Sequence, residues 1–70
     1  MSIYRFDEMP LYKQLKVTRV MHDLTQAQLV EKLGLPDVPM LSRIERGEIG
    51  IPLHHRKNIR EFVFGSGEEE

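Results

Sequence analysis

Two short segments with apolar residues at helical spacing, each followed by a glycine, occupy the middle of the chain. The first covers residues 25–33 and stops before Gly34, and the second covers residues 38–46 and stops before Gly47. Glycine readily adopts the left-handed conformation in which helices commonly end. The pattern therefore predicts two short helices that are joined by a tight turn and packed against each other.

Polar residues at the start of both segments suit helix caps. Thr25 is followed three positions later by Gln28, which is the spacing of a capping box. Asp37 suits the cap of the second segment, and Pro39 falls in its first turn, where a missing N–H costs little. The side chains expected to point inward from the two segments are Leu29, Val30, Leu33, Leu41 and Ile44, with Met40 as a further option.

Two further helices are predicted, over about residues 9–21 and about residues 52–62. Pro10 and Pro52 fall in their first turns, where proline is tolerated. An acidic residue, Asp7 or Glu8, stands at the start of the earlier helix, where it complements the helix dipole. The earlier helix carries a stripe of Leu11, Leu15 and Thr18, and the apolar positions of the later helix are Leu53, Ile59, Phe62 and Val63.

The two ends of the chain differ in character from its middle. Ile3, Tyr4 and Phe6 alternate with polar residues, which fits either a short strand or an arm that packs on the core. The chain closes with the polar run GSGEEE, which is typical of disordered tails. The predicted organisation is an N-terminal arm over residues 1–8, a helical domain over 9–64 and an acidic, disordered tail over 65–70.

The composition narrows the class of protein. The 70 residues include no cysteine, which excludes a disulfide framework and a thiolate zinc site. The net charge is −1, but without the three final glutamates ten basic side chains face eight acidic ones. This excess is small for a duplex-binding protein. No apolar run approaches the roughly 20 residues of a membrane span, so a cytoplasmic chain without a membrane partner is expected.

The amino-acid sequence of the two central segments is similar to that of one protein family. LTQAQLVEKLGL, followed by LSRIERGE, IPL and a further helix, resembles the XRE family, the DNA-binding domain of phage repressors and Cro proteins. The resemblance covers residues 11–63. It implies an all-α, compact four-helix domain of the lambda-repressor-like helix-turn-helix type. The N-terminal arm either packs on this domain or lies outside it. It also implies a sequence-specific transcriptional regulator that binds operator DNA, commonly as a homodimer.

The resemblance implies which residues would contact DNA. The helix over 38–46 would enter the major groove, and the start of the helix over 25–33 would lie on the phosphate backbone. Among the residues that would face the bases, Arg43 alone has the forked group that suits guanine, while the apolar residues before it offer contact only with thymine methyls. The implied DNA-binding residues are Thr25, Gln26, Gln28, Val38, Pro39, Met40, Ser42, Arg43 and Arg46. A homodimer contact would come from the last helix, the arm, or the surface formed by Val17, Val20 and Met21.

An ion pair within the domain is implied by the same resemblance. Arg19 and Glu45 match the family's paired arginine and glutamate, which link the first helix to the end of the third. An arginine and a carboxylate can form a planar, bidentate and charge-assisted pair. The pair is expected to fix the orientation of the helix over 38–46.

A second function fits the features that depart from the family. The turn before the helix over 38–46 is one residue longer than usual, no fifth helix follows, and the apolar tip of that helix is a better protein contact than a base reader. The alternative is therefore an anti-repressor or modulator that binds a partner repressor protein and blocks its binding to DNA. Its binding residues would be Asp37, Val38, Pro39 and Met40.

The remaining polar residues do not indicate a metal site or a catalytic site. His54 and His55 are adjacent, so they are expected to diverge on a helix, and no metal site is predicted. With Arg56, Lys57 and Arg60 they form either a basic patch or an ordinary solvated face. No nucleophile–base set and no phosphate-cradling glycine loop is present, so catalysis, a cofactor and a small-molecule substrate are not expected.

Overall fold

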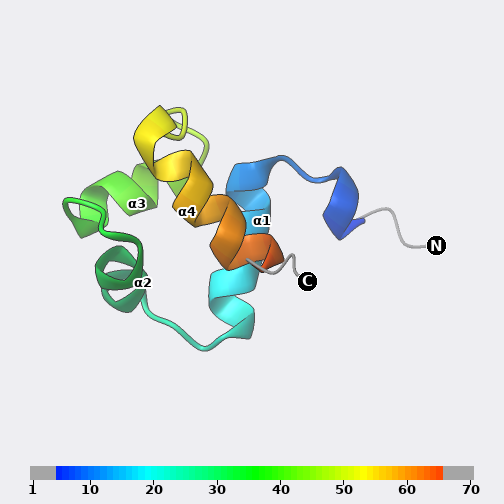
Figure 1. The fold of residues 1–70 in the computed structure, drawn as a ribbon, viewed down its shortest axis with the longest axis horizontal. Helices are drawn as coiled ribbons and strands as arrows, with labels where there is room; N and C mark the ends of the chain where they lie inside the picture. Colours follow the sequence, from blue (N-terminus) through cyan, green and yellow to red (C-terminus); the bar gives the residue numbers. More distant parts are fainter. Residues whose placement is uncertain (1–4, 66–70) are drawn as a thin grey trace.

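The computed structural model of the chain describes residues 5–65, and this part is all-α (Figure 1). It contains a short 3₁₀ helix and four α-helices, and no strand occurs among these residues. The elements are η1 (Phe6–Glu8), α1 (Leu11–Met21), α2 (Gln26–Leu33), α3 (Val38–Glu45) and α4 (Leu53–Phe64). The prediction of a compact all-α fold with four helices is thus confirmed. None of the helices in the described range is long and apolar enough to cross a membrane.

Helix α4 lies between α1 on one side and the α2–α3 pair on the other (Figure 1). Helix α1 also packs on α3, so that the four α-helices enclose one hydrophobic core. Leu35, in the turn after α2, is buried with them, although the sequence predicts only a turn at this point. The side chains with no solvent exposure at all are Leu15, Leu29, Leu41, Ile44 and Ile59, and each α-helix contributes at least one of them.

Side-chain caps start the two central helices, as the sequence predicts. The backbone N–H of Gln28 donates to Thr25 Oγ1 at 3.0 Å, and the N–H of Thr25 donates to Gln28 Oε1 at 2.8 Å. Asp37 Oδ1 accepts from the N–H of Met40 at 2.9 Å. Each bond satisfies a backbone donor that has no partner inside its helix, which fixes where α2 and α3 begin.

Three consecutive helices end in the same way. After α1, α2 and α3 a residue with positive φ is followed by an N–H that bonds to the carbonyl five positions earlier, the bond typical of a Schellman turn. The positive-φ residues are Asp23 (58°), Gly34 (72°) and Gly47 (75°). A hydrophobic residue commonly follows such a turn and packs back on the helix, which explains the burial of Leu35 after Gly34.

The N-terminal part differs from the prediction. Helix α1 begins at Leu11, with Pro10 as its N-cap, instead of at residue 9. Met9 is extended, with ψ of 148°, because a residue that precedes proline disfavours the helical conformation. Asp7 and Glu8 consequently lie in η1 and not in the first turn of α1. Phe6 lies in η1, so of the two alternatives for this segment the strand is wrong for Phe6, while Ile3 and Tyr4 lie outside the described residues.

The last helix is shifted by one residue at its start and extends further than predicted at its end. Pro52 is the N-cap of α4 and not part of its first turn, because its ψ of 137° is extended. The helix continues to Phe64, two residues beyond the predicted end, and Gly65 follows with φ of 86°. Residues 66–70, most of the predicted acidic tail, lie outside the described residues.

Candidate functional site

A buried ion pair joins α1 to the end of α3. Arg19 Nε lies 2.7 Å from Glu45 Oε2, and Arg19 Nη2 lies 3.2 Å from Glu45 Oε1. The pair is therefore bidentate, the geometry in which arginine binds a carboxylate most strongly. The side chain of Glu45 is only 2% exposed and that of Arg19 13%, so the contact is largely shielded from water. It holds the C-terminal end of α3 at a fixed position on α1.

A third residue extends this pair to α2. Gln26 Nε2 donates to Glu45 Oε1 at 3.1 Å, and Arg19 Nη1 donates to the carbonyl of Leu24 at 2.9 Å. Leu24 precedes the cap of α2 and Gln26 is its first residue, so both ends of the ion pair contact the start of this helix. We call Arg19, Gln26 and Glu45 the clamp. The clamp fixes the start of α2 next to the end of α3.

The solvent side of α3 is a narrow ridge. Pro39, Arg43 and Arg46 are exposed and are spaced four and three residues apart, so they lie on one face of the helix. Val38 and Met40 are half-buried, and Met40 packs against the core. Of the apolar residues predicted at the tip, Pro39 is thus the one that is exposed. We call Pro39, Arg43 and Arg46 the α3 ridge.

The two arginines of the α3 ridge differ in whether they form an ion pair. Arg46 is bound to Glu48 through a 2.7 Å Nε–Oε2 contact and a 3.2 Å Nη2–Oε1 contact, and its Nη1 also donates to Ser42 Oγ. The hydrogen bond and the charge of Glu48 raise the pKa of Arg46, and the hydrogen bond from Arg46 lowers the pKa of Glu48. Arg43 is in none of the ion pairs found within residues 5–65. Its guanidinium is the more available of the two.

The predicted contacts at the start of α2 are already partly engaged within the protein. The side chains of Thr25 and Gln28 form the capping box, and one N–H of the Gln26 amide is given to Glu45. The amide of Gln26 keeps a second N–H, because the group has two donors. The backbone N–H groups of Gln26 and Ala27 have no partner inside the helix, since they belong to its first turn. These groups, beside the positive end of the helix dipole, suit an anion.

Acidic side chains at both ends of α3 reduce the positive charge of this surface. Glu48 pairs with Arg46 after the helix, and Asp37, which the sequence already places at the tip, caps its start. The rings of His54 and His55 lie with centroids 4.2 Å apart, so the expectation that they diverge is wrong. No group of three or more metal-ligating side chains gathers within residues 5–65.

The sequence reasoning missed Gln14 and the role of Gln26. Gln14 is buried on α1, where its Nε2 donates to the carbonyl of Phe6 at 2.7 Å and holds η1 against the helix. No pattern in the sequence marks this bond, because its two residues are eight positions apart. The sequence predicts Gln26 only as a contact with DNA, whereas the fold brings its side chain beside the end of α3, where it donates to Glu45.

Comparison of the chain with models of protein families, with curated protein sequences and with solved structures found no match in any of the three. The site therefore has to be interpreted from its own geometry and chemistry.

Proposed function

We propose that the protein is a sequence-specific DNA-binding regulator of transcription, of the small phage repressor or Cro kind. In this proposal α2 and α3 form a lambda-repressor-like helix-turn-helix, with α3 in the major groove and the start of α2 on the phosphate backbone. The observation that supports it most is the clamp. A buried bidentate ion pair with an added amide bond holds the exposed α3 ridge and the start of α2 in one rigid arrangement.

Each part of this surface has a role in the proposed complex. Arg43 donates two hydrogen bonds to O6 and N7 of a guanine, because it is exposed and outside the ion pairs of the described chain. Pro39 and the exposed part of Val38 contact thymine methyls. The free N–H groups at the start of α2 bind a phosphate oxygen and set the register of the helix pair on the duplex.

Arg46 reaches the backbone only by exchanging partners. Its guanidinium is held by Glu48, so a phosphate has to replace that carboxylate. The exchange costs little, because both side chains are about half exposed and such pairs are weak in water. One copy thus offers few phosphate contacts, which favours binding of a homodimer to two half-sites about one helical turn apart.

The test is selection of a preferred site from a randomised duplex pool, followed by fluorescence anisotropy at about 50 and about 200 mM salt. We expect submicromolar binding to the selected duplex, weaker binding to an unrelated duplex, and a loss of affinity as salt rises. Arg43→Ala should reduce affinity for the selected site by roughly tenfold or more, since a bidentate guanine contact contributes about 1–3 kcal/mol.

Arg56→Ala is the matched control, because it removes the same charge from an exposed position on α4, which contributes no residue to the α3 ridge. It should weaken binding much less than Arg43→Ala. If no duplex is selected, or if both variants weaken binding equally, the DNA-reading function is wrong.

A second function is favoured by the charge of the same surface. The pairing of Arg46 with Glu48 and the carboxylate of Asp37 leave little net positive charge beside the apolar Val38 and Pro39. Such a surface suits a protein contact, where apolar burial is rewarded and charge is depleted. The protein would then bind a repressor and block its DNA-reading surface. Absence of DNA binding, together with release of a repressor from its operator that Pro39→Glu abolishes, would establish this alternative.

A further inference from the structure

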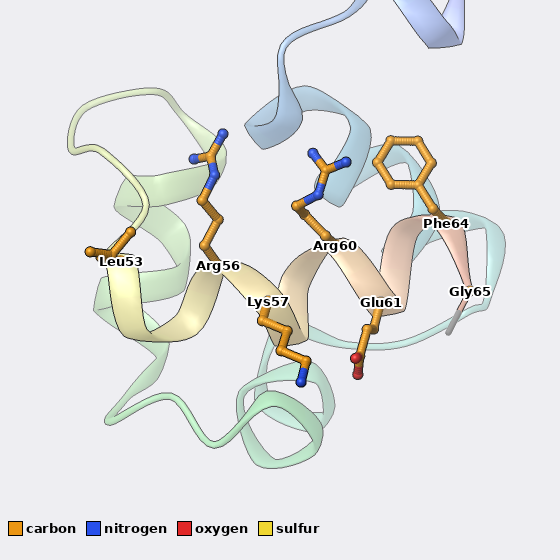
Figure 2. A pocket seen from close by; sticks show the side chains of 7 residues that line it. All are labelled: Leu53, Arg56, Lys57, Arg60, Glu61, Phe64 and Gly65. Atoms are coloured by element: carbon orange, nitrogen blue, oxygen red, sulfur yellow. The ribbon is translucent and has the colours of Figure 1, made fainter. Parts of the chain in front are cut away.

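The side of α4 that faces solvent combines large apolar groups with a cluster of positive charge. Leu53 at its start is 83% exposed and Phe64 at its end is 52% exposed. Figure 2 shows Arg56, Arg60 and Phe64 directed to one side of the helix, with Lys57 and Glu61 on the other. These side chains border a shallow hollow of about 570 Å³. We call the six residues Leu53, Arg56, Lys57, Arg60, Glu61 and Phe64 the α4 outer face.

The charge of this face is unbalanced. Arg56, Lys57 and Arg60 carry three positive charges against the single negative charge of Glu61. None of the ion pairs formed within residues 5–65 involves an α4 residue. The guanidinium of Arg60 instead lies 5.3 Å above the ring of Phe64, an arrangement in which a cation covers an aromatic face. The face therefore has cations that are available to an acidic partner.

We propose that the α4 outer face is a docking site for an acidic amphipathic helix of another protein. Carboxylates of the partner bind Arg56, Lys57 and Arg60 in the middle of the face. Apolar side chains of the partner cover Leu53 and Phe64 at its two ends. These apolar ends are eleven positions apart, which on a helix is a distance of about 16 Å, so three to four turns of a partner helix span the face.

Charge complementarity favours this occupant over a second copy of the chain. In a symmetric dimer through this face, the arginines of one copy would lie opposite those of the other. Like charges at the centre of an interface oppose association. An acidic helix places opposite charge at the same points.

The apolar groups favour a protein over the other anionic partners. A duplex would neutralise the cations but leave Leu53 and Phe64 in water, because phosphates make no apolar contact. A membrane surface requires a wide apolar stripe along the helix. Here two apolar side chains stand apart, and the ring of Phe64 already forms a T-shaped pair with that of Phe6, with ring centroids 6.3 Å apart.

The proposal does not depend on the function of the α3 ridge. The two surfaces share no residue and lie on different helices, so binding of an acidic helix can be measured whether or not the protein binds DNA. Arg43→Ala, which tests DNA reading, should leave binding at the α4 outer face unchanged.

The probe is a fluorescein-labelled peptide of about 14 residues, roughly four turns of helix, with Leu on one face and Glu elsewhere. A second peptide has Gln in place of every Glu. We expect micromolar binding of the Glu peptide and at least about tenfold weaker binding of the Gln peptide, because the central contacts require carboxylates. The double variant Arg56→Glu/Arg60→Glu should weaken binding of the Glu peptide by about tenfold or more, and Leu53→Ser should weaken it several-fold.

The matched control is Lys13→Glu/Lys16→Glu, which makes the same charge change on exposed positions of α1. It should retain most of the binding, and circular dichroism should show that both double variants are folded. Equal losses in the two double variants, or equal binding of the Glu and Gln peptides, would overturn the proposal.

Further measurements separate the other occupants. Binding of duplex DNA or of anionic vesicles that depends on Arg56 and Arg60, without binding of the Glu peptide, would assign the face to those partners instead. Sedimentation that shows a dimer disrupted by Arg56→Glu/Arg60→Glu would assign it to a second copy. A tenfold gain in peptide affinity when Glu68, Glu69 and Glu70 are changed to Gln would assign it to the chain's own acidic run.

Discussion

Two arginine–glutamate pairs in this molecule have the same local geometry and different surroundings. In both Arg19–Glu45 and Arg46–Glu48, the Nε–Oε2 distance is 2.7 Å and the Nη2–Oε1 distance is 3.2 Å. The first pair is 13% and 2% exposed, whereas the second is 54% and 53% exposed. The contact geometry alone therefore does not determine how much either pair contributes to stability. The two pairs differ in how far their side chains are buried.

Burial changes what happens when one partner is removed. Water replaces a lost partner at the exposed pair, and salt already screens its attraction. At the buried pair, removal of Glu45 leaves the charge of Arg19 without a carboxylate, with only the carbonyl of Leu24 still accepting from it, and takes the acceptor from Gln26 Nε2. The buried pair thus defines the arrangement of three helices, while the exposed pair governs how much charge the α3 ridge offers.

The largest expected effect comes from breaking the buried pair. Glu45→Ala should lower the free energy of unfolding by about 3–5 kcal/mol, because it leaves the largely buried charge of Arg19 without its carboxylate. A loss of that size is comparable with the whole stability expected of a domain this small, so the variant should be largely unfolded. Glu48→Ala should leave stability nearly unchanged. Urea unfolding followed by circular dichroism measures both.

A milder substitution keeps this test interpretable if Glu45→Ala does not fold. Glu45→Gln keeps one acceptor oxygen at the same position but replaces the other with an N–H donor and removes the charge, so it should fold with an intermediate stability. If the melting temperature of Glu45→Ala stays within a few degrees of that of the unchanged chain, the clamp does not stabilise the domain as argued.

The turn that carries the exposed pair provides the second test. Gly47 lies between Arg46 and Glu48 with φ of 75°, and a Cβ added there would lie 2.9 Å from Cζ of Tyr12. Gly34 has a similar φ of 72°, but a Cβ there would meet nothing within 4 Å. Both Ala variants suffer the cost of a left-handed side chain, about 1–2 kcal/mol. Gly47→Ala should cost about 1–3 kcal/mol more, because the ring of Tyr12 has to move.

Thermal unfolding of the two variants measures this difference directly. Tyr12→Ala combined with Gly47→Ala should remove most of the excess, since the crowding is then absent. Equal destabilisation by Gly34→Ala and Gly47→Ala would mean that Tyr12 adapts without cost and does not support the turn.

The sequence predicts the parts of the fold that rest on local chemistry. The caps at Thr25 and Asp37 and the helix ends at Gly34 and Gly47 follow from residue types at fixed spacing, and the structure has all four. The predicted start of α1 at residue 9 is wrong, because Met9 precedes Pro10 and is therefore extended. The preference of a residue before proline for the extended conformation would have placed the start of α1 correctly.

The candidate site was less accessible to sequence reasoning. Arg19 and Glu45 were paired only through a resemblance, because residues 26 positions apart carry no local signal. Arg46 and Glu48 are two positions apart, a spacing that does not bring side chains together on a helix, and they meet because the chain turns at Gly47. The pairing of Arg46 with Glu48, which determines the available charge of the α3 ridge, therefore could be found only from the three-dimensional structure.

The smallest expected effect is the pH dependence of the exposed pair. The hydrogen bond from Arg46 lowers the pKa of Glu48 in the folded protein below its ordinary value. A lowered carboxyl pKa contributes stability above the pKa of the unfolded chain, about 4.3, and this contribution is lost as the pH falls through the folded pKa. The difference in stability between the unchanged chain and Glu48→Gln should be constant near neutral pH and should shrink in acid. Because the pair is exposed, high salt should reduce the difference further.

A titration by NMR that shows the pKa of Glu48 at or above its ordinary value would mean that Arg46 is free in solution, and the α3 ridge would then carry two available cations instead of one.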